Sequence, residues 1–388
     1  MKILMVHPHD LHSPSEPWTI RIKKIAAEFR KMGHEVKIVY FPLNSGRAYM
    51  SLKEDGIEMY TLSRRLGILV LLRNIIRMAR LTGWCDIIHF QKCYYHVALP
   101  VLISALIKNK PVHYDWDDWE TKIFYYSNPR VVAVGGFIDI FEKLIPGIVD
   151  TVSVSSRHVR RLSLKRGVPE NRIFPASVGA DLEKFHPDLD RGAVKKKYGI
   201  NNHLVLYLGQ LHGAQYAELF IKAARMIIDK GLDATFMIAG DGYRLRELKE
   251  LAGQLKTGSR LIFTGYVPHE EVPGYIAAAD ICVACFEEND ITKCKSPLKI
   301  VEYLACGKAI VASNVGEVRN MAGGVAVLTK PGDVDSLANG ITLLLQDHEL
   351  REKLAKTAVE RAKRRYNWKV TAESIMRAYD TALCGRGN

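Results

Sequence analysis

The sequence predicts an α/β protein of two doubly wound parallel-sheet domains that face each other across a cleft. Its 388 residues exceed what one ordinary hydrophobic core serves and suit two domains of similar size. Short apolar runs alternate with helical patterns, as expected for a parallel sheet that helices cover on both faces. The alternation breaks over residues 179–201 and then restarts. We therefore expect one domain before this break and one after it.

Continuous apolar runs predict the strands of the first domain, residues 1–190, and a helical period predicts its helices. The first helix should end at Gly33, because glycine readily adopts the left-handed conformation that closes a helix. The expected strands are residues 3–6, 35–40, 85–90, 111–114 and 151–155, and the expected helices are residues 20–32 and 97–108. Strands that alternate with helices in this way pair in parallel.

The second domain, residues 200–365, repeats the alternation. Its expected strands are residues 204–208, 234–239, 260–263 and 281–286, and its expected helices are residues 218–230, 244–255 and 272–279. Residues 366–388 should form a C-terminal helix that packs back toward the first domain. In open parallel sheets, ligands bind beyond the carboxyl ends of the strands, so we expect substrates in the cleft between the two domains.

The composition, 48% apolar and 25% charged, is typical of a folded globular protein. Residues 1–6 are too short an apolar run for a secretory signal, and no later run reaches the roughly 20 residues that cross a membrane. Seven cysteines without a regular framework indicate reduced thiols and a cytoplasmic protein. Cys282 and Cys285 have metal-ligand spacing, but they lie in an apolar run and are expected to be buried thiols.

The formal net charge of +13 favours an anionic partner. Arg73, Arg77 and Arg80 recur at helical spacing beside leucines and isoleucines, a pattern typical of helices that lie on an anionic membrane surface. A second basic stripe is formed by Arg157, Arg161 and Lys165. A solvated helix face that packs on its own domain explains both stripes equally well. We expect an anionic lipid partner rather than nucleic acid.

The segment 295–313 predicts a helix followed by a strand. Ser296 is a suitable N-cap, and Pro297 suits the first helical position because its missing N–H would have no partner there. Gly307 supplies the C-terminal stop. Both ends of this helix are therefore marked in the sequence.

A helix that begins at the rim of a parallel sheet presents free amides to a ligand, here those of Leu298, Lys299 and Ile300. Lys299 adds a positive charge to this expected diphosphate site, and the carboxylate of Glu302 lies one turn deeper, where it can accept hydrogen bonds from ribose. The alternative is an ordinary cap with a Lys299–Glu302 surface ion pair that contributes under about 1 kcal/mol.

A series of short motifs favours the diphosphate site. The motifs of the second half are residues 206–209 (LYLG), 237–242 (MIAGDG), 262–267 (IFTGYV), 278–280 (AAD), 296–303 (SPLKIVEY) and 305–307 (ACG), and those of the first half are 33–36 (GHEV) and 179–181 (GAD), with Phe185 and Pro187. In order and spacing they resemble the family-4-like retaining glycosyltransferases, or glycosyl transferases group 1, which have the GT-B fold. The resemblance covers nearly the whole chain.

The resemblance implies a retaining hexosyltransferase that uses a UDP- or GDP-sugar as donor and a lipid-linked or polysaccharide acceptor, peripheral to the cytoplasmic membrane face, without a metal cofactor. Glu302 then corresponds to the second acidic residue of the family and binds the donor ribose. Residues 296–300 hold the diphosphate, with Lys299 as a catalytic cation. Tyr266 and Val267 meet the base, and the loop with Gly209 and Gln210 approaches the phosphates.

The chain departs from the family pattern at several positions. Gln210 and Gln215 stand where many members have an arginine and a lysine, and Cys294 stands where the first acidic residue is expected. Asp117 aligns with the histidine near the reaction centre, inside the cluster Tyr114–Glu120 of three aspartates and two tryptophans. We expect Asp117 to contact sugar or acceptor, although a Mg²⁺ or Mn²⁺ site and a structural role are open alternatives.

Two other functions are alternatives. A nucleotide-sugar epimerase or phosphorylase has the same two-domain fold, but neither the linker nor the segment 296–302 suggests it. A degenerate member would bind nucleotide or an anionic surface without turnover, as the residues at positions 210, 215 and 294 suggest. Release of UDP or GDP from a panel of nucleotide sugars separates these functions.

Overall fold

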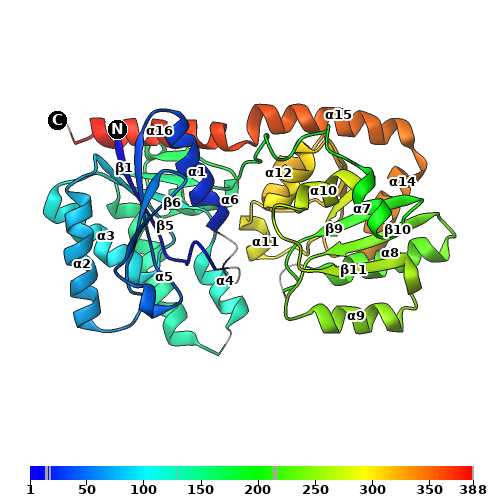
Figure 1. The fold of residues 1–388 in the computed structure, drawn as a ribbon, viewed down its shortest axis with the longest axis horizontal. Coiled ribbons are helices and arrows are strands. Elements are labelled where there is room, and N and C mark those ends of the chain that lie inside the picture. The colour runs from blue at the N-terminus through cyan, green and yellow to red at the C-terminus, as the bar shows by residue number, and fades with distance from the viewer. Residues whose placement is uncertain (14–15, 17–18, 129, 213–215, 387–388) are drawn as a thin grey trace. The chain divides into compact units, whose positions relative to one another are not determined.

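The computed structural model describes residues 1–388 except 14–15, 17–18, 129, 213–215 and 387–388. The chain forms two compact units, one of Met1–Ser177 with Trp368–Asn388 and one of Val178–Asn367 (Figure 1). Each unit has one predominantly parallel sheet with helices on it. The prediction of two doubly wound α/β domains is therefore confirmed.

Unit 1 is built on an eight-stranded sheet in the order β3-β4-β2-β1-β5-β6-β7-β8. The strands are β1 (Lys2–His7), β2 (Glu35–Tyr40), β3 (Ser51–Glu54), β4 (Ile57–Thr61), β5 (Ile87–Gln91), β6 (Val112–Trp116), β7 (Thr151–Val154) and β8 (Ile173–Pro175). Only the β3–β4 pair is antiparallel. Strand β1 pairs with β2 and β5, with Ile3 opposite Val36 and Ile87. The chain therefore leaves β1 in one direction and β5 in the other, and the sheet has its switch point between them.

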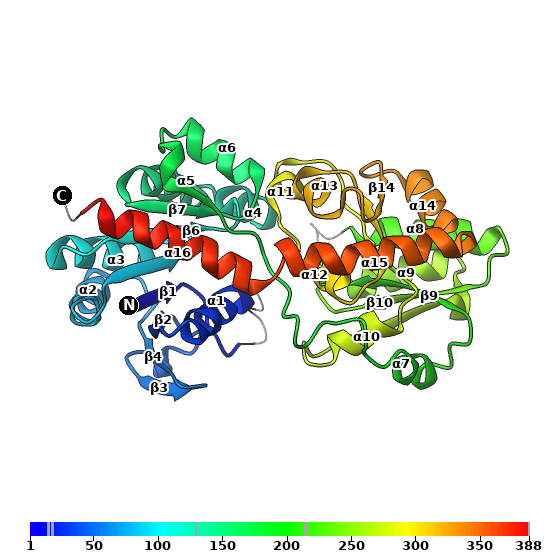
Figure 2. The ribbon, with the colours of Figure 1, turned by 90° about the horizontal axis from the view of Figure 1, so that it is seen from above.

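The helices of unit 1 cover both faces of this sheet (Figure 2). They are α1 (Ile20–Lys31), α2 (Ile68–Thr82), α3 (Tyr95–Lys108), α4 (Glu120–Ser127), α5 (Val132–Ile148), α6 (Arg157–Lys165) and α16 (Trp368–Cys384). Right-handed crossovers place α1 on one face and α2, α3, α5 and α6 on the other. Helix α16 packs on α1, β6, β7 and β8.

Unit 2 has a six-stranded parallel sheet in the order β11-β10-β9-β12-β13-β14. Its strands are β9 (His203–Leu208), β10 (Ala234–Ala239), β11 (Leu261–Gly265), β12 (Ile281–Ala284), β13 (Ala309–Ser313) and β14 (Val327–Thr329). Its helices are α7 (Gly192–Lys197), α8 (Ala217–Asp229), α9 (Leu245–Gln254), α10 (Val272–Ala278), α11 (Asp290–Cys294), α12 (Leu298–Ala305), α13 (Gly316–Ala322), α14 (Val334–Gln346) and α15 (His348–Arg365).

The strands are buried along their length because helices cover both faces. Every residue from Leu204 to Tyr207 in β9 is fully buried, and the same holds for Ile3 to Val6 in β1. Phe220 and Phe236 pack ring against ring in the core of unit 2. Burial of these apolar side chains provides most of the stability of each unit, at about 25 cal/mol per Å² of apolar surface.

The C-terminal helix α16 belongs to unit 1, although the preceding α15 belongs to unit 2. Tyr379 of α16 is fully buried, and its hydroxyl lies 2.7 Å from Nδ1 of His89 in β5. The Thr371 hydroxyl donates to the carbonyl oxygen of Ser177 at 2.7 Å. These contacts fix the C-terminal helix to the sheet of unit 1, which also contains the first strand of the chain.

Two smaller predictions concern membranes and thiols. Over the described ranges, none of the helices combines the length and apolarity needed to cross a membrane. All seven cysteines are free, and Cys282 and Cys285 are buried in and just after β12, as expected from their apolar surroundings. Burial raises the pKa of the Cys285 thiol to about 12, so it stays protonated and unreactive.

Candidate functional site

The candidate site of unit 2 lies at the carboxyl ends of β9 and β12. Strand β9 stands between β10 and β12, so the strand order reverses at this point. Loops that leave such a switch point on opposite sides open a crevice in which α/β proteins bind ligands. The loop after β9 begins at Gly209, and the loop after β12 leads through α11 to the start of α12. The residues predicted to bind a nucleotide therefore lie at the carboxyl ends of the strands, where ligands of such sheets bind.

The start of α12 differs by one residue from the predicted start. Pro297 is the N-cap, with extended backbone (ψ 122°), and the helix begins at Leu298. Ser296 was expected to cap the helix, but its hydroxyl instead lies 3.8 Å from Sδ of Met321. The Ile300 amide donates to the Pro297 carbonyl oxygen at 3.2 Å. The expectation of three free amides is therefore wrong for Ile300, and Leu298 and Lys299 are the remaining first-turn donors.

Lys299 points its ammonium group into the protein. Nζ is buried and lies 4.4 Å from the centre of the Tyr207 ring and 5.8 Å from that of Phe286. Among the described residues it has no hydrogen-bond partner. Burial lowers the pKa of Lys299 to about 8. A buried ammonium group held only by aromatic faces gains strongly from any anion that reaches it.

Glu302 is buried one turn further along α12 and has a partner that the sequence did not indicate. Its Oε1 lies 3.1 Å from Nε2 of His269, which follows β11. The same loop carries Tyr266, whose side chain is 64% exposed, and Val267. Glu302 thus contacts, through His269, the loop that carries the predicted base-binding residues. A ribose hydroxyl at Glu302 would share the carboxylate with this imidazole.

The loop after β9 packs backbone against backbone on the loop after β10. The Gly209 amide donates to Ala239 O at 3.0 Å, and the Leu211 amide donates to Asp241 O at 2.8 Å. A Cβ atom at Gly240 would lie 1.9 Å from Gly209 O. This contact explains why glycine follows β10. Gln210 continues the loop, whereas Gln215 lies outside the described residues.

The Cys294 side chain is hydrogen-bonded within α11. It is buried, and its thiol donates to the Asp290 carbonyl oxygen at 2.9 Å within α11. Lys293, on the same short helix, pairs with Glu288 at 3.3 Å. Lys295 lies near His212, where its charge adds to burial in lowering the imidazole pKa. The charge of Lys295 also lowers the pKa of Lys299, so both lysines add positive charge near the start of α12.

In unit 1, the acidic and aromatic cluster divides into a structural part and an accessible part. Asp115 is fully buried and accepts hydrogen bonds from Nε and Nη2 of Arg21, both at 2.7 Å. Trp116 is also buried, and its indole N–H donates to Glu142 at 3.1 Å. These two residues of the predicted ligand cluster therefore use their polar groups to hold β6 in the fold.

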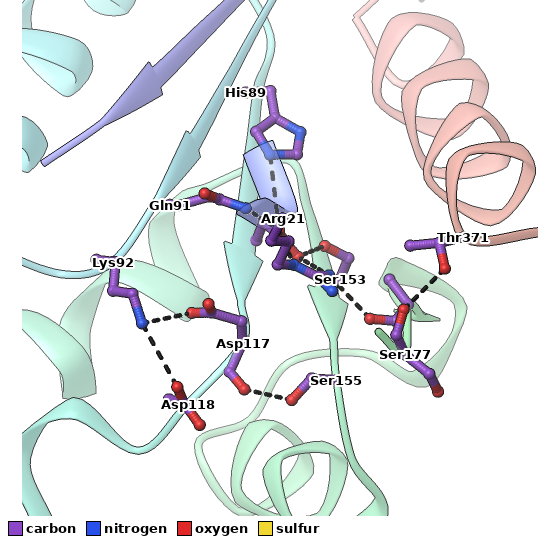
Figure 3. Close-up of polar contacts among 12 residues, drawn as sticks. Arg21, His89, Gln91, Lys92, Asp117, Asp118, Ser153, Ser155, Ser177 and Thr371 are labelled. Carbon is purple, nitrogen blue, oxygen red and sulfur yellow. Dashed lines mark hydrogen bonds and ion pairs between the residues drawn. The ribbon is translucent and has the colours of Figure 1, made fainter. Parts of the chain in front are cut away.

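Asp117 lies just beyond β6 in a charge cluster around Lys92 (Figure 3). Nζ of Lys92 lies 3.1 Å from Asp117, 3.6 Å from Asp118 and 2.5 Å from Glu120. Oxygens of the three carboxylates lie within 4.8 Å of one another, which is close enough to share a metal ion. Lys92 already supplies a positive charge to them, so a divalent cation would have to compete with a buried ammonium group.

We expect Glu120 to make stability depend on pH near neutrality. Burial raises the pKa of Glu120 to about 7, with Asp117 and Asp118 adding to the shift and Lys92 opposing it. A carboxyl group with a raised folded pKa favours the folded state most below its unfolded pKa of about 4.3, and this benefit is lost as pH rises to about 7. Between pH 4.5 and 7.5, the free energy of unfolding of wild type should fall by up to about 3 kcal/mol relative to that of Glu120→Gln. If the free energies of unfolding of wild type and Glu120→Gln changed with pH in parallel, Glu120 would not titrate in this range.

The two predicted basic stripes are partly engaged within unit 1. The guanidinium groups of Arg73 and Arg77 lie 3.9 and 4.8 Å from the centre of the Tyr49 ring. Arg161 donates from Nε to the Arg157 carbonyl oxygen at 3.5 Å. Each stripe therefore combines some intradomain contacts with cations at the surface.

Comparison with known proteins identifies unit 2. Residues 190–361 match the family described as glycosyl transferases group 1. Unit 2 is a group 1 glycosyltransferase domain. Its relatives include alpha-D-kanosaminyltransferase of Streptomyces kanamyceticus, 27% identical over 222 residues, or 55% of this chain and 56% of the relative. The GDP-mannose-dependent alpha-(1-6)-phosphatidylinositol monomannoside mannosyltransferase of Mycolicibacterium smegmatis is 26% identical over 51% of this chain and 53% of its own length.

The solved structures agree over the whole chain. HepE of Anabaena, in complex with UDP and glucose, matches with a TM-score of 0.77 at 18% identity, covering 98% of this chain and 99% of HepE. This likeness shows the GT-B fold. The sequence matches are shorter, and they span about half the length of the curated relatives. The group 1 domain is thus identified by sequence, and the two-domain fold by structure.

Sequence reasoning missed His269, Lys92 and Arg21, which contact Glu302, Asp117 and Asp115 respectively. His269 follows β11, and Lys92 and Arg21 are far in sequence from the carboxylates they contact. Lys92 has a local signal, because it directly follows β5 at the carboxyl edge of the sheet. A lone lysine at a strand end could therefore have been paired with the aspartates that end the neighbouring strand.

Proposed function

We propose that the chain is a retaining glycosyltransferase that moves a sugar from a UDP- or GDP-sugar to a lipid-linked or glycan acceptor. The observation that carries the proposal is the buried Lys299 ammonium group at the start of α12, beside the switch point of the group 1 domain. A diphosphate there would meet a positive helix end and an ammonium group that has no hydrogen-bond partner among the described residues.

In this proposal, the amides of Leu298 and Lys299 and the Lys299 ammonium group bind the diphosphate. Glycosyl transfer builds negative charge on the departing nucleoside diphosphate, so groups that favour this charge speed the reaction. Glu302 accepts from the ribose hydroxyls, the Tyr266–Val267 backbone meets the base, and Gly209 and Gln210 lie along the phosphates. In unit 1, Asp117 contacts sugar or acceptor.

The names of the relatives support the choice of donor and acceptor. One relative is named for a GDP-mannose donor and a phosphatidylinositol mannoside acceptor, and HepE was solved with UDP and glucose. Another, of Escherichia coli, is named for a UDP-Gal donor and a diphosphoundecaprenol acceptor. A lipid-linked acceptor places this chain at a membrane face, where we propose that it acts on the cytoplasmic side.

The decisive experiment incubates the chain with a panel of UDP- and GDP-sugars and measures release of free nucleotide with and without membrane lipid extract. We expect one donor to give release that lipid stimulates, with retained anomeric configuration in the product. Binding of UDP or GDP without any release would favour a nucleotide-binding protein without turnover. Conversion of the donor sugar without release would favour an epimerase.

Glu302→Gln should weaken binding of the preferred nucleotide about tenfold, or about 1.4 kcal/mol. The amide keeps the size of the side chain but removes the charge that accepts the ribose hydroxyls. Isothermal titration with UDP and GDP measures the effect, and the exposed Glu349→Gln in α15 provides a matched control. Equal affinities for wild type and Glu302→Gln would contradict the ribose role.

A further inference from the structure

Exposed apolar side chains in unit 1 concentrate on one layer of helices. Helix α2 contacts α3, α3 contacts α5, and Arg166, directly after α6, donates to the Glu142 carbonyl oxygen in α5 (Figures 1 and 2). We call the outer side of α2, α3, α5 and α6 the helix layer. Its central apolar residues are each more than half exposed: Leu106 and Ile107 of α3, and Phe137, Ile140, Leu144 and Ile148 of α5. On the opposite face, the described residues of α1 and α16 include no exposed large apolar side chain.

Helix α5 is apolar on both sides. One side, which includes Ile138 and Ile145, is buried. Phe137, Ile140 and Leu144 recur at intervals of three and four residues, so they form a stripe on the other side. The core of unit 1 does not need this stripe. An exposed apolar stripe of this length on a folded domain marks a binding surface.

The charges of the helix layer are nearly all positive. Helices α2, α3, α5 and α6 contain nine lysines and arginines and two acidic residues. Of these two, Glu142 is buried, and Asp139 pairs with Lys143. By whole units, unit 1 has 29 Lys and Arg against 18 Asp and Glu, an excess of 11, and unit 2 has 26 against 24, an excess of 2. The positive charge of the protein and its exposed apolar surface thus coincide.

We infer that the helix layer docks unit 1 on an anionic lipid bilayer. Helices that lie in the interface of a bilayer place apolar side chains among the acyl chains and cations among the headgroups. The stripe of α5 and the basic residues Arg157, Arg161 and Lys165 of neighbouring α6 provide both. A second copy of the chain is disfavoured as occupant, because it would bring two strongly positive surfaces together. The inference rests on the proposed function in one respect: docking would bring the site to a lipid-linked acceptor.

The test is co-sedimentation of the full chain with vesicles of phosphatidylcholine, with and without phosphatidylglycerol, in the absence of nucleotide. Wild type should bind the anionic vesicles at least tenfold more tightly than the neutral ones. The triple variant F137Q/I140Q/L144Q should bind the anionic vesicles at least tenfold more weakly than wild type. The variant R157Q/R161Q/K165Q should lose a similar factor in affinity, and its binding should depend less on salt. Leu343→Gln, at an exposed apolar position of α14 in unit 2, is the matched control and should bind like wild type.

The variant R73Q/R77Q/R80Q measures the contribution of α2. We expect a smaller loss, because Arg73 and Arg77 also contact Tyr49. All glutamine variants should keep the wild-type nucleotide affinity, and those of α5 and α6 should keep the wild-type melting temperature, since the side chains changed there lie at the surface. Wild-type vesicle binding by the α5 variant overturns the inference. So does a dimer that the α5 variant converts to a monomer. Neither result bears on nucleotide release, which tests the proposed function separately.

Discussion

Replacing Lys299 by methionine should lower kcat/KM for sugar transfer about 100-fold, which corresponds to about 2.7 kcal/mol of transition-state stabilisation. The ammonium group is buried at the start of α12 without a hydrogen-bond partner among the described residues, so a diphosphate would be its first strong partner. Methionine keeps the length of the side chain and its contacts with Tyr207 and Phe286. The free energy of unfolding should stay the same or rise, because a buried charge without a partner is removed.

The pH dependence of binding separates this role from a structural one. The pKa of Lys299 is lowered to about 8 by burial, so the unliganded protein loses this charge above that pH. UDP or GDP affinity should therefore fall for wild type between pH 7 and 9.5 but remain flat for Lys299→Met. Lys330→Met, at an exposed position of the same unit, should behave like wild type in kinetics and binding. Wild-type turnover by Lys299→Met would show that another cation meets the diphosphate.

The buried strands could be predicted because their signals are local. Strands β2 and β10 end where expected, since each is rich in apolar residues and lies near a turn glycine, Gly33 and Gly240 respectively. Helix α5 was missed because Gly135, Gly136 and Pro146 interrupt its pattern. In the structure, a Cβ atom at Gly135 would meet the Tyr125 ring at 2.4 Å, so this glycine serves the contact between α4 and α5. Tertiary packing thus stabilises a helix in a segment whose own helix propensity is low.

The candidate site was predictable only in part. The location of α12 follows from Pro297 and Gly307, but its first residue depends on the ψ angle of the proline, which the sequence does not give. The contact of Glu302 with His269 spans 33 residues, and that of Asp115 with Arg21 spans 94. Such pairings arise when parallel strands bring their ends to one edge of a sheet. The residue types that carry charge can be predicted, whereas their partners depend on the topology.

Replacing Gly240 by alanine should destabilise unit 2 by about 3 kcal/mol. Gly240 follows β10 with φ +150°, a conformation that residues with a Cβ atom rarely adopt, and its Cβ would lie 1.9 Å from Gly209 O. Backbone cannot move aside as a flexible side chain can, so the loop after β9 must shift. Because that loop carries Gly209 and Gln210, nucleotide affinity should fall together with stability.

Gly231→Ala is the matched control in the turn between α8 and β10. Gly231 also has positive φ, at +70°, but a Cβ atom there would have nothing within 4 Å. Its replacement should cost about 1 kcal/mol, the conformational cost alone, and leave nucleotide affinity unchanged. Thermal unfolding of both variants under the same conditions isolates the steric part of the Gly240 effect. Equal losses in the two variants would mean that the loops after β9 and β10 are not in backbone contact, and the phosphate-binding role of the Gly209 loop would lose its structural support.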